Sequence, residues 1–181
     1  MDDADDALIR RSQDGDADAF GILVKRYAGR ATGVAVVLVG NHADALDVSQ
    51  EAFVRAWRHV RTFRGDSSFF VWYSSILRKV ALTWLRRRRK QSNEELMEAQ
   101  AVPHAGADPA VLAERNEQTE RLWQAILELP TKHREVLVLK HFEHLSYKEI
   151  AGVLEIPIGT VMSRLHTARE ALRAQFSGDE R

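Results

Sequence analysis

The sequence predicts an all-α protein with two small helical domains joined by a flexible linker. Apolar residues recur at helical spacing through most of the chain, while glycine and proline are scarce inside these periodic segments. No alternating strand pattern stands out. The charge is also uneven: residues 1–90 hold 16 basic and 11 acidic side chains, residues 91–120 hold 1 and 7, and residues 121–181 hold 9 and 8. A basic front, an acidic middle and a near-neutral end indicate two modules and a connection.

The first predicted domain spans residues 1–92. Its apolar periodicity predicts helices over residues 5–13, 17–29, 31–39, 43–60 and 68–89. Asp16 and Ser67 are the expected N-caps, and Gly40 is the expected helix stop. The β-branched run 34–39 would suit a strand by propensity alone, but its isolation between helical patterns favours a buried helix.

The predicted linker spans residues 93–108, where polar and acidic residues precede Pro103 and Gly106, and Pro109 follows it directly. The second predicted domain spans residues 109–181. Its periodicity predicts helices over residues 109–128, 132–143, 147–154 and 158–175.

The second domain contains a pattern typical of a DNA-reading helix-turn-helix. Ser146 can cap a short helix, with Glu149 three residues on as in a capping box. Pro157 ends that helix, and a second one follows with Val161 and Leu165 facing inward. Its outward face offers side chains that can meet phosphates or base edges in a major groove: Thr160, Ser163, Arg164, His166 and Arg169.

Aromatic and basic residues alternate near the end of the first domain. Residues 63–73 contain three phenylalanines, one tryptophan and one tyrosine, and residues 86–90 are five consecutive cations. Bases stack on aromatic rings while cations hold the backbone, so this composition suits single-stranded DNA. Phe69, Trp72 and Trp84 are better explained as core residues, whereas five cations exceed what a helix C-terminus requires.

The composition limits the cellular compartments in which the protein is expected. There are no cysteines, so disulfides and thiolate metal sites are excluded. The longest apolar stretch, residues 33–40, is too short to cross a bilayer, and the acidic N-terminus is unlike a signal peptide. We therefore expect a cytoplasmic protein with no direct membrane insertion.

Two other functions remain open at this point. A dimeric transcriptional regulator would use the same helix-turn-helix but would give residues 47–57 no natural role. A metal hydrolase could use His141 and His144, but their spacing differs from the i, i+4 pair of the helical zinc motif. No glycine-rich phosphate loop or nucleophile elbow is present, so we expect no enzyme, no metal and no cofactor.

Three segments, in this order, resemble the extracytoplasmic-function (ECF) group of sigma factors of bacterial RNA polymerase. Residues 47–53 resemble the segment that docks on the polymerase β′ clamp helices. Residues 63–67, followed by Phe69 and Trp72, resemble the −10 element reader. Leu129-Pro130, residues 134–137, residues 145–147 and the segment 157–166 resemble the −35 reader.

The resemblance implies a role for individual residues. The implied polymerase contacts are Asp47, Gln50, Glu51 and Phe53. The implied −10 contacts are Arg55, Phe63, Arg64, Gly65, Asp66, Ser67, Lys79, Arg86 and Arg87, with the 63–68 loop capturing a flipped base. The implied −35 contacts are Ser146, Tyr147, Gly159, Thr160, Met162, Ser163, Arg164, His166 and Arg169.

The resemblance also implies partners: core RNA polymerase, through its β′ clamp helices and β flap, promoter DNA and an anti-sigma factor. Some positions depart from the family pattern. Lys79 replaces a common asparagine that helps to read the −10 bases, and Ser75 and Thr83 replace residues that are often Arg and Asp. Met162 and Thr167 stand where a basic residue is common. The resemblance therefore supports the polymerase-binding role of this chain more strongly than it supports any particular promoter sequence.

Overall fold

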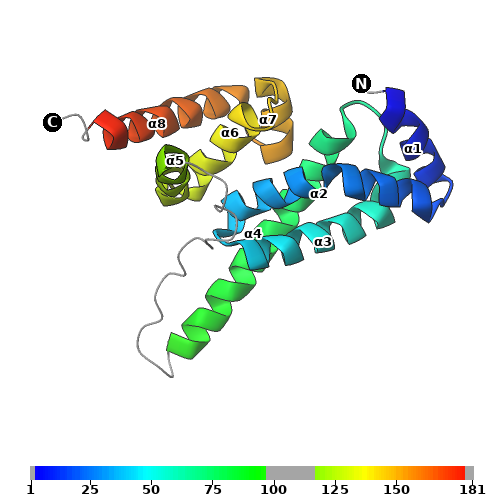
Figure 1. Ribbon diagram of the computed structural model, residues 1–181, viewed down its shortest axis with the longest axis horizontal. Coiled ribbons are helices and arrows are strands. Elements are labelled where there is room, and N and C mark those ends of the chain that lie inside the picture. The colour runs from blue at the N-terminus through cyan, green and yellow to red at the C-terminus, as the bar shows by residue number, and fades with distance from the viewer. Residues whose placement is uncertain (1–2, 97–116, 178–181) are drawn as a thin grey trace.

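The computed structural model describes residues 3–96 and 117–177, and every regular element within them is helical (Figure 1). The first module consists of α1 (Asp3–Gln13), α2 (Ala17–Val39), α3 (His42–His59), the 3-10 turn η1 (Val60–Thr62) and α4 (Phe69–Leu96). The second consists of α5 (Glu117–Glu128), α6 (Thr131–His141), α7 (Tyr147–Leu154) and α8 (Ile158–Ser177). The all-α prediction with two helical domains is confirmed. No helix of the described segments is long and apolar enough to cross a bilayer.

Helix α2 is continuous, so the prediction of two helices over residues 17–29 and 31–39 was wrong. Gly29 and Gly33 lie inside it, although glycine in a helix interior costs about 1 kcal/mol relative to alanine. Burial of the Val34–Val39 run in the apolar core offsets that cost. Asp16 caps the start by accepting the Ala19 N–H at 3.0 Å, and Gly40 ends the helix at a φ of +93°, as predicted.

Helix α4 is the longest element, with 28 residues and hence a length of about 42 Å. The predicted N-cap, Ser67, was wrong by one position: the Ser68 hydroxyl accepts the Val71 N–H at 3.3 Å. The helix also extends past the predicted end at residue 89 to Leu96, and Figure 1 shows its C-terminal part projecting beyond the other helices. The rest of the predicted linker (97–108) and residues 109–116 of the predicted helix lie outside the described residues.

Aromatic side chains dominate the core of the first module. Phe53 of α3 stacks on Tyr73 of α4 with ring centroids 4.3 Å apart. Phe69 lies edge-on to Phe20 of α2 at 6.3 Å and also contacts Tyr27. These contacts join three helices around one apolar centre.

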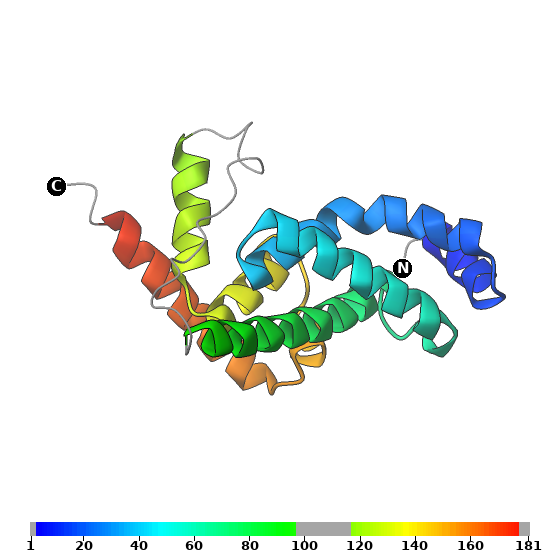
Figure 2. The same cartoon turned by 90° about the horizontal axis from the view of Figure 1, so that it is seen from below.

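The second module docks directly on the first. Helix α6 packs against α2, and α7 packs against α4, which Figure 2 shows from a second direction. Val138 of α6 belongs to the core of the first module, while Val71 of α4 belongs to that of α7 and α8. An apolar seam therefore joins the two modules.

Candidate nucleic-acid interface

The helix-turn-helix forms with the predicted capping box. The Ser146 hydroxyl accepts the Glu149 N–H at 3.2 Å, and the Glu149 carboxylate accepts the Ser146 N–H at 2.8 Å. Glu155 then ends α7 in the left-handed region at a φ of +55°, and α8 begins three residues later. Buried Ile150, Val161 and Leu165 hold the two helices together. The turn therefore fixes the direction of α8.

Helix α8 presents an uninterrupted exposed face near its N-terminus. Gly159, Met162, Ser163 and His166 are exposed, while Thr160, Arg164 and Arg169 are half-buried. The structure therefore brings the predicted −35 residues of α8 onto one helix. Ser146 and Tyr147 lie at the start of α7, where the Ser146 hydroxyl is engaged in the cap and the Tyr147 ring lies 5.1 Å from the Lys140 ammonium.

Sequence reasoning missed Ile158 on this face. Its side chain is 46% exposed and Met162, one turn later, is 54% exposed, so two apolar side chains lie beside the polar ones. Apolar groups in a major groove can contact a thymine methyl. The signal available in the sequence was their i, i+4 spacing, which places both side chains on one side of a helix.

The loop before α4 separates its aromatic residue from its polar ones. Phe63 is buried and its ring lies 5.2 Å from that of Trp72, whereas Arg64 and Asp66 are exposed. Gly65 adopts a φ of +78°, which favours glycine. Sequence reasoning missed Gln13 here: its amide donates to the carbonyl oxygens of Val60 and Phe63 at 3.1 and 2.8 Å and so fixes the base of the loop.

The basic run lies on the exposed C-terminal part of α4. Arg86 and Arg87 are exposed, as a phosphate-facing patch requires. Arg88 donates to Asp44 of α3 at 2.6 Å and lies over the Trp84 ring at 5.1 Å, so it also has a structural role. Lys79, a predicted −10 contact, forms an ion pair of 2.7 Å with Glu155 of the second module.

The predicted polymerase face occupies one side of α3. Asp47, Gln50 and Glu51 are exposed, and Glu51 pairs with Arg55 at 2.7 Å. Phe53 lies in the core instead, so in this conformation it supports the face from beneath. Leu46 and Val54, which sequence reasoning missed, are 40% and 45% exposed next to these polar residues.

His141 and His144, the pair considered for a metal, do not form a metal cluster with other ligand residues in the part of the chain that the structure describes. The Arg169 guanidinium lies 3.2 Å from the His141 ring. Burial, together with this cation and Lys140, lowers the pKa of His141. The Nε2 atom of His141 is therefore engaged with Arg169.

A two-module helical protein with an open helix-turn-helix is a DNA-binding transcription protein in its general class. Residues 23–91 match the family model of sigma-70 region 2, and residues 119–172 match that of sigma-70 region 4. The chain is 38% identical to the RNA polymerase sigma-H factor of Pseudomonas aeruginosa, covering 93% of this chain and 91% of the relative. It is 36% identical to the ECF RNA polymerase sigma-E factor of Escherichia coli K12, covering 93% and 92%.

Two solved structures resemble this chain along most of its length. CnrH in complex with the cytosolic domain of CnrY superposes with a TM-score of 0.71 at 27% identity, covering 98% of this chain and all of that one. The sigma factor RpoE of Bartonella quintana, in complex with the anti-sigma factor NepR, gives 0.76 at 22% identity over 89% and 98%, which supports the fold. The chain belongs to the sigma-70 family, in its ECF group. It is a transcription initiation factor that directs promoter-specific transcription, which sets aside the dimeric-regulator alternative.

Proposed function

We propose that this sigma factor performs no covalent chemistry itself and acts in the cytoplasm by binding core RNA polymerase through the exposed face of α3. The supporting observation is that Asp47 and Gln50 are exposed and stand beside exposed Leu46 and Val54. Apolar side chains among a few polar ones are typical of the centre of a protein–protein interface. We propose the β′ clamp helices as the partner of this face, and the β flap as a partner of the second module.

For the −10 element, the proposed contacts are the 63–68 loop, Arg55, Lys79, Arg86 and Arg87. Arg64 and Asp66 are exposed on a loop whose base is held by Gln13, so a flipped base would meet a fixed surface rather than a mobile one. Extruding a base costs a few kcal/mol of stacking, which hydrogen bonds in the loop would offset. Phe63 would support the loop from the core.

For the −35 element, the proposed reader is the exposed face of α8. Ser163, Arg164 and His166 would meet base edges or phosphates, and Gly159 would allow close approach of the backbone. Tethering two readers makes the second contact intramolecular, so each alone can be weak. This fits a chain with no net charge.

An anti-sigma factor is a further proposed partner. The solved structures of CnrH and of RpoE were each obtained in complex with another protein, and the partner of RpoE is named as an anti-sigma factor. The similarity of this chain to CnrH, which was solved with the cytosolic domain of another protein bound, supports a protein partner for this chain as well.

In vitro transcription with purified core polymerase tests the proposal. The double variant Asp47→Ala/Gln50→Ala should lose promoter-dependent transcripts and co-elution with core, because it removes two exposed polar contacts. Asp14→Ala is the matched control, since Asp14 is exposed on the α1–α2 turn away from the proposed face. Normal co-elution of the folded double variant would refute the docking assignment.

A further inference from the structure

The reading face of α8 carries two exposed apolar side chains. Ile158 is the first residue of α8 and Met162 is the fifth, and Met162 is the most exposed large apolar residue of the segments that the structure describes. Residues four apart lie on the same side of an α-helix, so the two side chains are neighbours. The inward side of α8 is formed by other residues, among them Val161 and Leu165, which are buried. Ile158 and Met162 are therefore not needed to hold α8 in its module.

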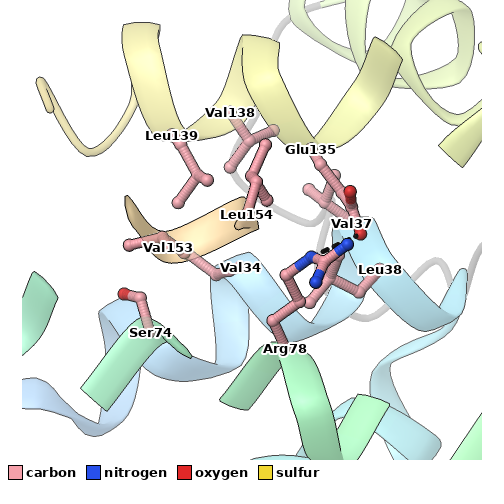
Figure 3. Close-up of a pocket in the computed structure, with 10 residues that line it drawn as sticks. All are labelled: Val34, Val37, Leu38, Ser74, Arg78, Glu135, Val138, Leu139, Val153 and Leu154. Carbon is pink, nitrogen blue, oxygen red and sulfur yellow. Dashed lines mark ion pairs between the residues drawn. The ribbon is translucent and has the colours of Figure 1, made fainter. Parts of the chain in front are cut away.

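The contact between the two modules does not cover these two side chains. Its apolar residues, which Figure 3 shows, are Val34, Val37, Leu38, Val138, Leu139, Val153 and Leu154. Glu135 pairs with Arg78 beside them at 3.4 Å, and Glu143 accepts two hydrogen bonds from the Arg30 guanidinium. The second module contributes to this contact from α6, α7 and the turn between them. The exposed side of α8 is left open to another partner.

Positive charge lies on both sides of the exposed face of α8. Arg169 lies on the same side as Ile158, about three helical turns further along. Arg164 lies on the other side, because six residues of an α-helix turn through about 240°. Burial, followed by the charges of Lys132 and Arg164, lowers the pKa of His133, which places a second cation close to Arg164. Cations on both sides favour a polyanion such as duplex DNA as the partner of this face.

The hydroxyl groups of this face already donate hydrogen bonds within α8. Ser163 donates to the Thr160 carbonyl oxygen at 3.1 Å, and Thr167 donates to the Ser163 carbonyl oxygen at 3.1 Å. A hydroxyl group whose proton is used in this way can still accept a hydrogen bond but has no donor to offer. Gly159 adds no side chain. At the N-terminal end of α8, where a recognition helix meets base edges, apolar surface is therefore the main means of distinguishing bases.

Thymine is the base that an apolar side chain can select. It alone presents a methyl group in the major groove, whereas the other bases present only donors and acceptors there. An apolar side chain buries the methyl group favourably, but it leaves the polar edge of another base desolvated and without a partner, which costs free energy. The chemistry of the exposed pair therefore matches thymine.

We propose that Ile158 and Met162 are specificity residues that read thymine methyl groups in the −35 element. The proposal rests on the proposed function of α8 as the −35 reader and adds the base that it selects. Four residues of α-helix rise by about 6 Å, and successive base pairs by about 3.4 Å. The two methyl groups therefore belong to base pairs that lie one or two steps apart.

Selection of promoter duplexes locates the thymines. Holoenzyme assembled from the full chain and core polymerase is mixed with duplexes randomised over the −35 element, and the bound sequences are determined. The wild-type protein should recover T·A pairs at two positions one or two steps apart. The double variant Ile158→Ala/Met162→Ala should lose the preference at these positions and keep the preferences at the other positions of the element.

Replacement of thymine by deoxyuridine then removes only the methyl group and keeps the base pair. At each of the two positions it should weaken binding of the wild-type holoenzyme about fourfold, as expected for one buried methyl group. Ile158→Ala should abolish the effect at one position, and Met162→Ala should abolish it at the other. Met162→Leu keeps an apolar side chain and should retain the effect, whereas Met162→Gln, which has a similar length but is polar, should lose it.

Arg173→Ala is the matched control on the same helix. Arg173 is exposed further along α8 and pairs with Glu170, so this variant should keep the full effect of deoxyuridine at both positions. Co-elution with core polymerase is measured for every variant, because it separates a loss of DNA reading from a loss of assembly.

Three results would overturn thymine reading by this pair while leaving the proposed function intact. They are a recovered element without thymine, equal affinity of the wild-type holoenzyme for thymine and deoxyuridine duplexes, and an effect of deoxyuridine that all variants retain. Loss of co-elution by the double variant with unchanged base preferences would also overturn it, since the two side chains would then contact a protein. If the wild-type holoenzyme selects no sequence at all in the −35 region, the proposed function of α8 is itself wrong.

Discussion

The Phe53 ring stacks on the Tyr73 ring at 4.3 Å, and the Tyr73 hydroxyl donates to the Ser49 carbonyl oxygen at 3.2 Å. Two contacts from one tyrosine therefore fix α3 against α4. Burial raises the pKa of Tyr73, so its hydroxyl stays protonated and remains a donor. The face that is proposed to bind polymerase is held in place from beneath by this pair.

Alanine substitutions of the neighbouring residues Phe53 and Val54 on α3 should affect different properties, stability in one case and polymerase binding in the other. Phe53→Ala should lower the free energy of unfolding by about 3–5 kcal/mol, because it leaves a cavity beside Tyr73. Val54→Ala should change stability little, since Val54 is 45% exposed, but should weaken binding to core polymerase. Urea unfolding and co-elution with core check the two halves. Equal stability of the two variants would contradict the core position of Phe53.

Ser146→Ala should destabilise the second module by about 1 kcal/mol, because it removes the capping box of α7. The start of α7 would fray and binding to the −35 element would weaken with it. Hydrogen exchange of the α7 amides measures the fraying. Ser163→Ala is the matched control for stability: its exposed hydroxyl donates only to the Thr160 carbonyl oxygen within α8, so those amides should keep their protection.

Arg164→Ala should weaken promoter binding by about 1–3 kcal/mol if its guanidinium contacts a base. The loss should then depend on the base at one position of the −35 element, which a library of duplexes would show. A loss of affinity that is equal for all duplex sequences would instead indicate that Arg164 contacts a phosphate. Arg173→Ala, further along the exposed part of α8 where Arg173 pairs with Glu170, should have little effect.

Asp16 should contribute to the loss of folding stability at acidic pH. The Ala19 N–H and the Arg11 guanidinium hold the pKa of Asp16 below its usual 3.8. When folding lowers the pKa of a carboxyl group, its charged form stabilises the protein at pH values above the pKa of the unfolded state. That stabilisation is lost as the pH falls through the pKa of the folded state. Asp16→Asn keeps a capping oxygen but no charge, so stability should fall less steeply below about pH 4. Thermal unfolding between pH 6 and 3 measures this, and identical slopes would contradict it.

Local signals predicted the second module well. The capping box and Pro157 gave α7 at residues 147–154, as the structure has it, because caps and breakers act within a few residues. Where burial competes with local preference, the sequence was misleading. The sequence predicted separate helices over residues 17–29 and 31–39, but burial of the Val34–Val39 run keeps α2 whole.

The contacts between modules could not be predicted from local patterns. Arg30 and Glu143 are 113 residues apart, and neither residue has a neighbour in sequence that indicates the other. The roles proposed for the polymerase and DNA residues rest on resemblance and exposure, and the experiments above address them.

Helix α4 has a mechanical consequence. Its N-terminal half holds Val71 and Arg78 against the second module, while its C-terminal half exposes Arg86 and Arg87 without a break in the helix. A rigid rod transmits displacement from one end to the other. A nucleic acid strand bound at Arg86 and Arg87 would therefore act on the same continuous helix against which α7 packs.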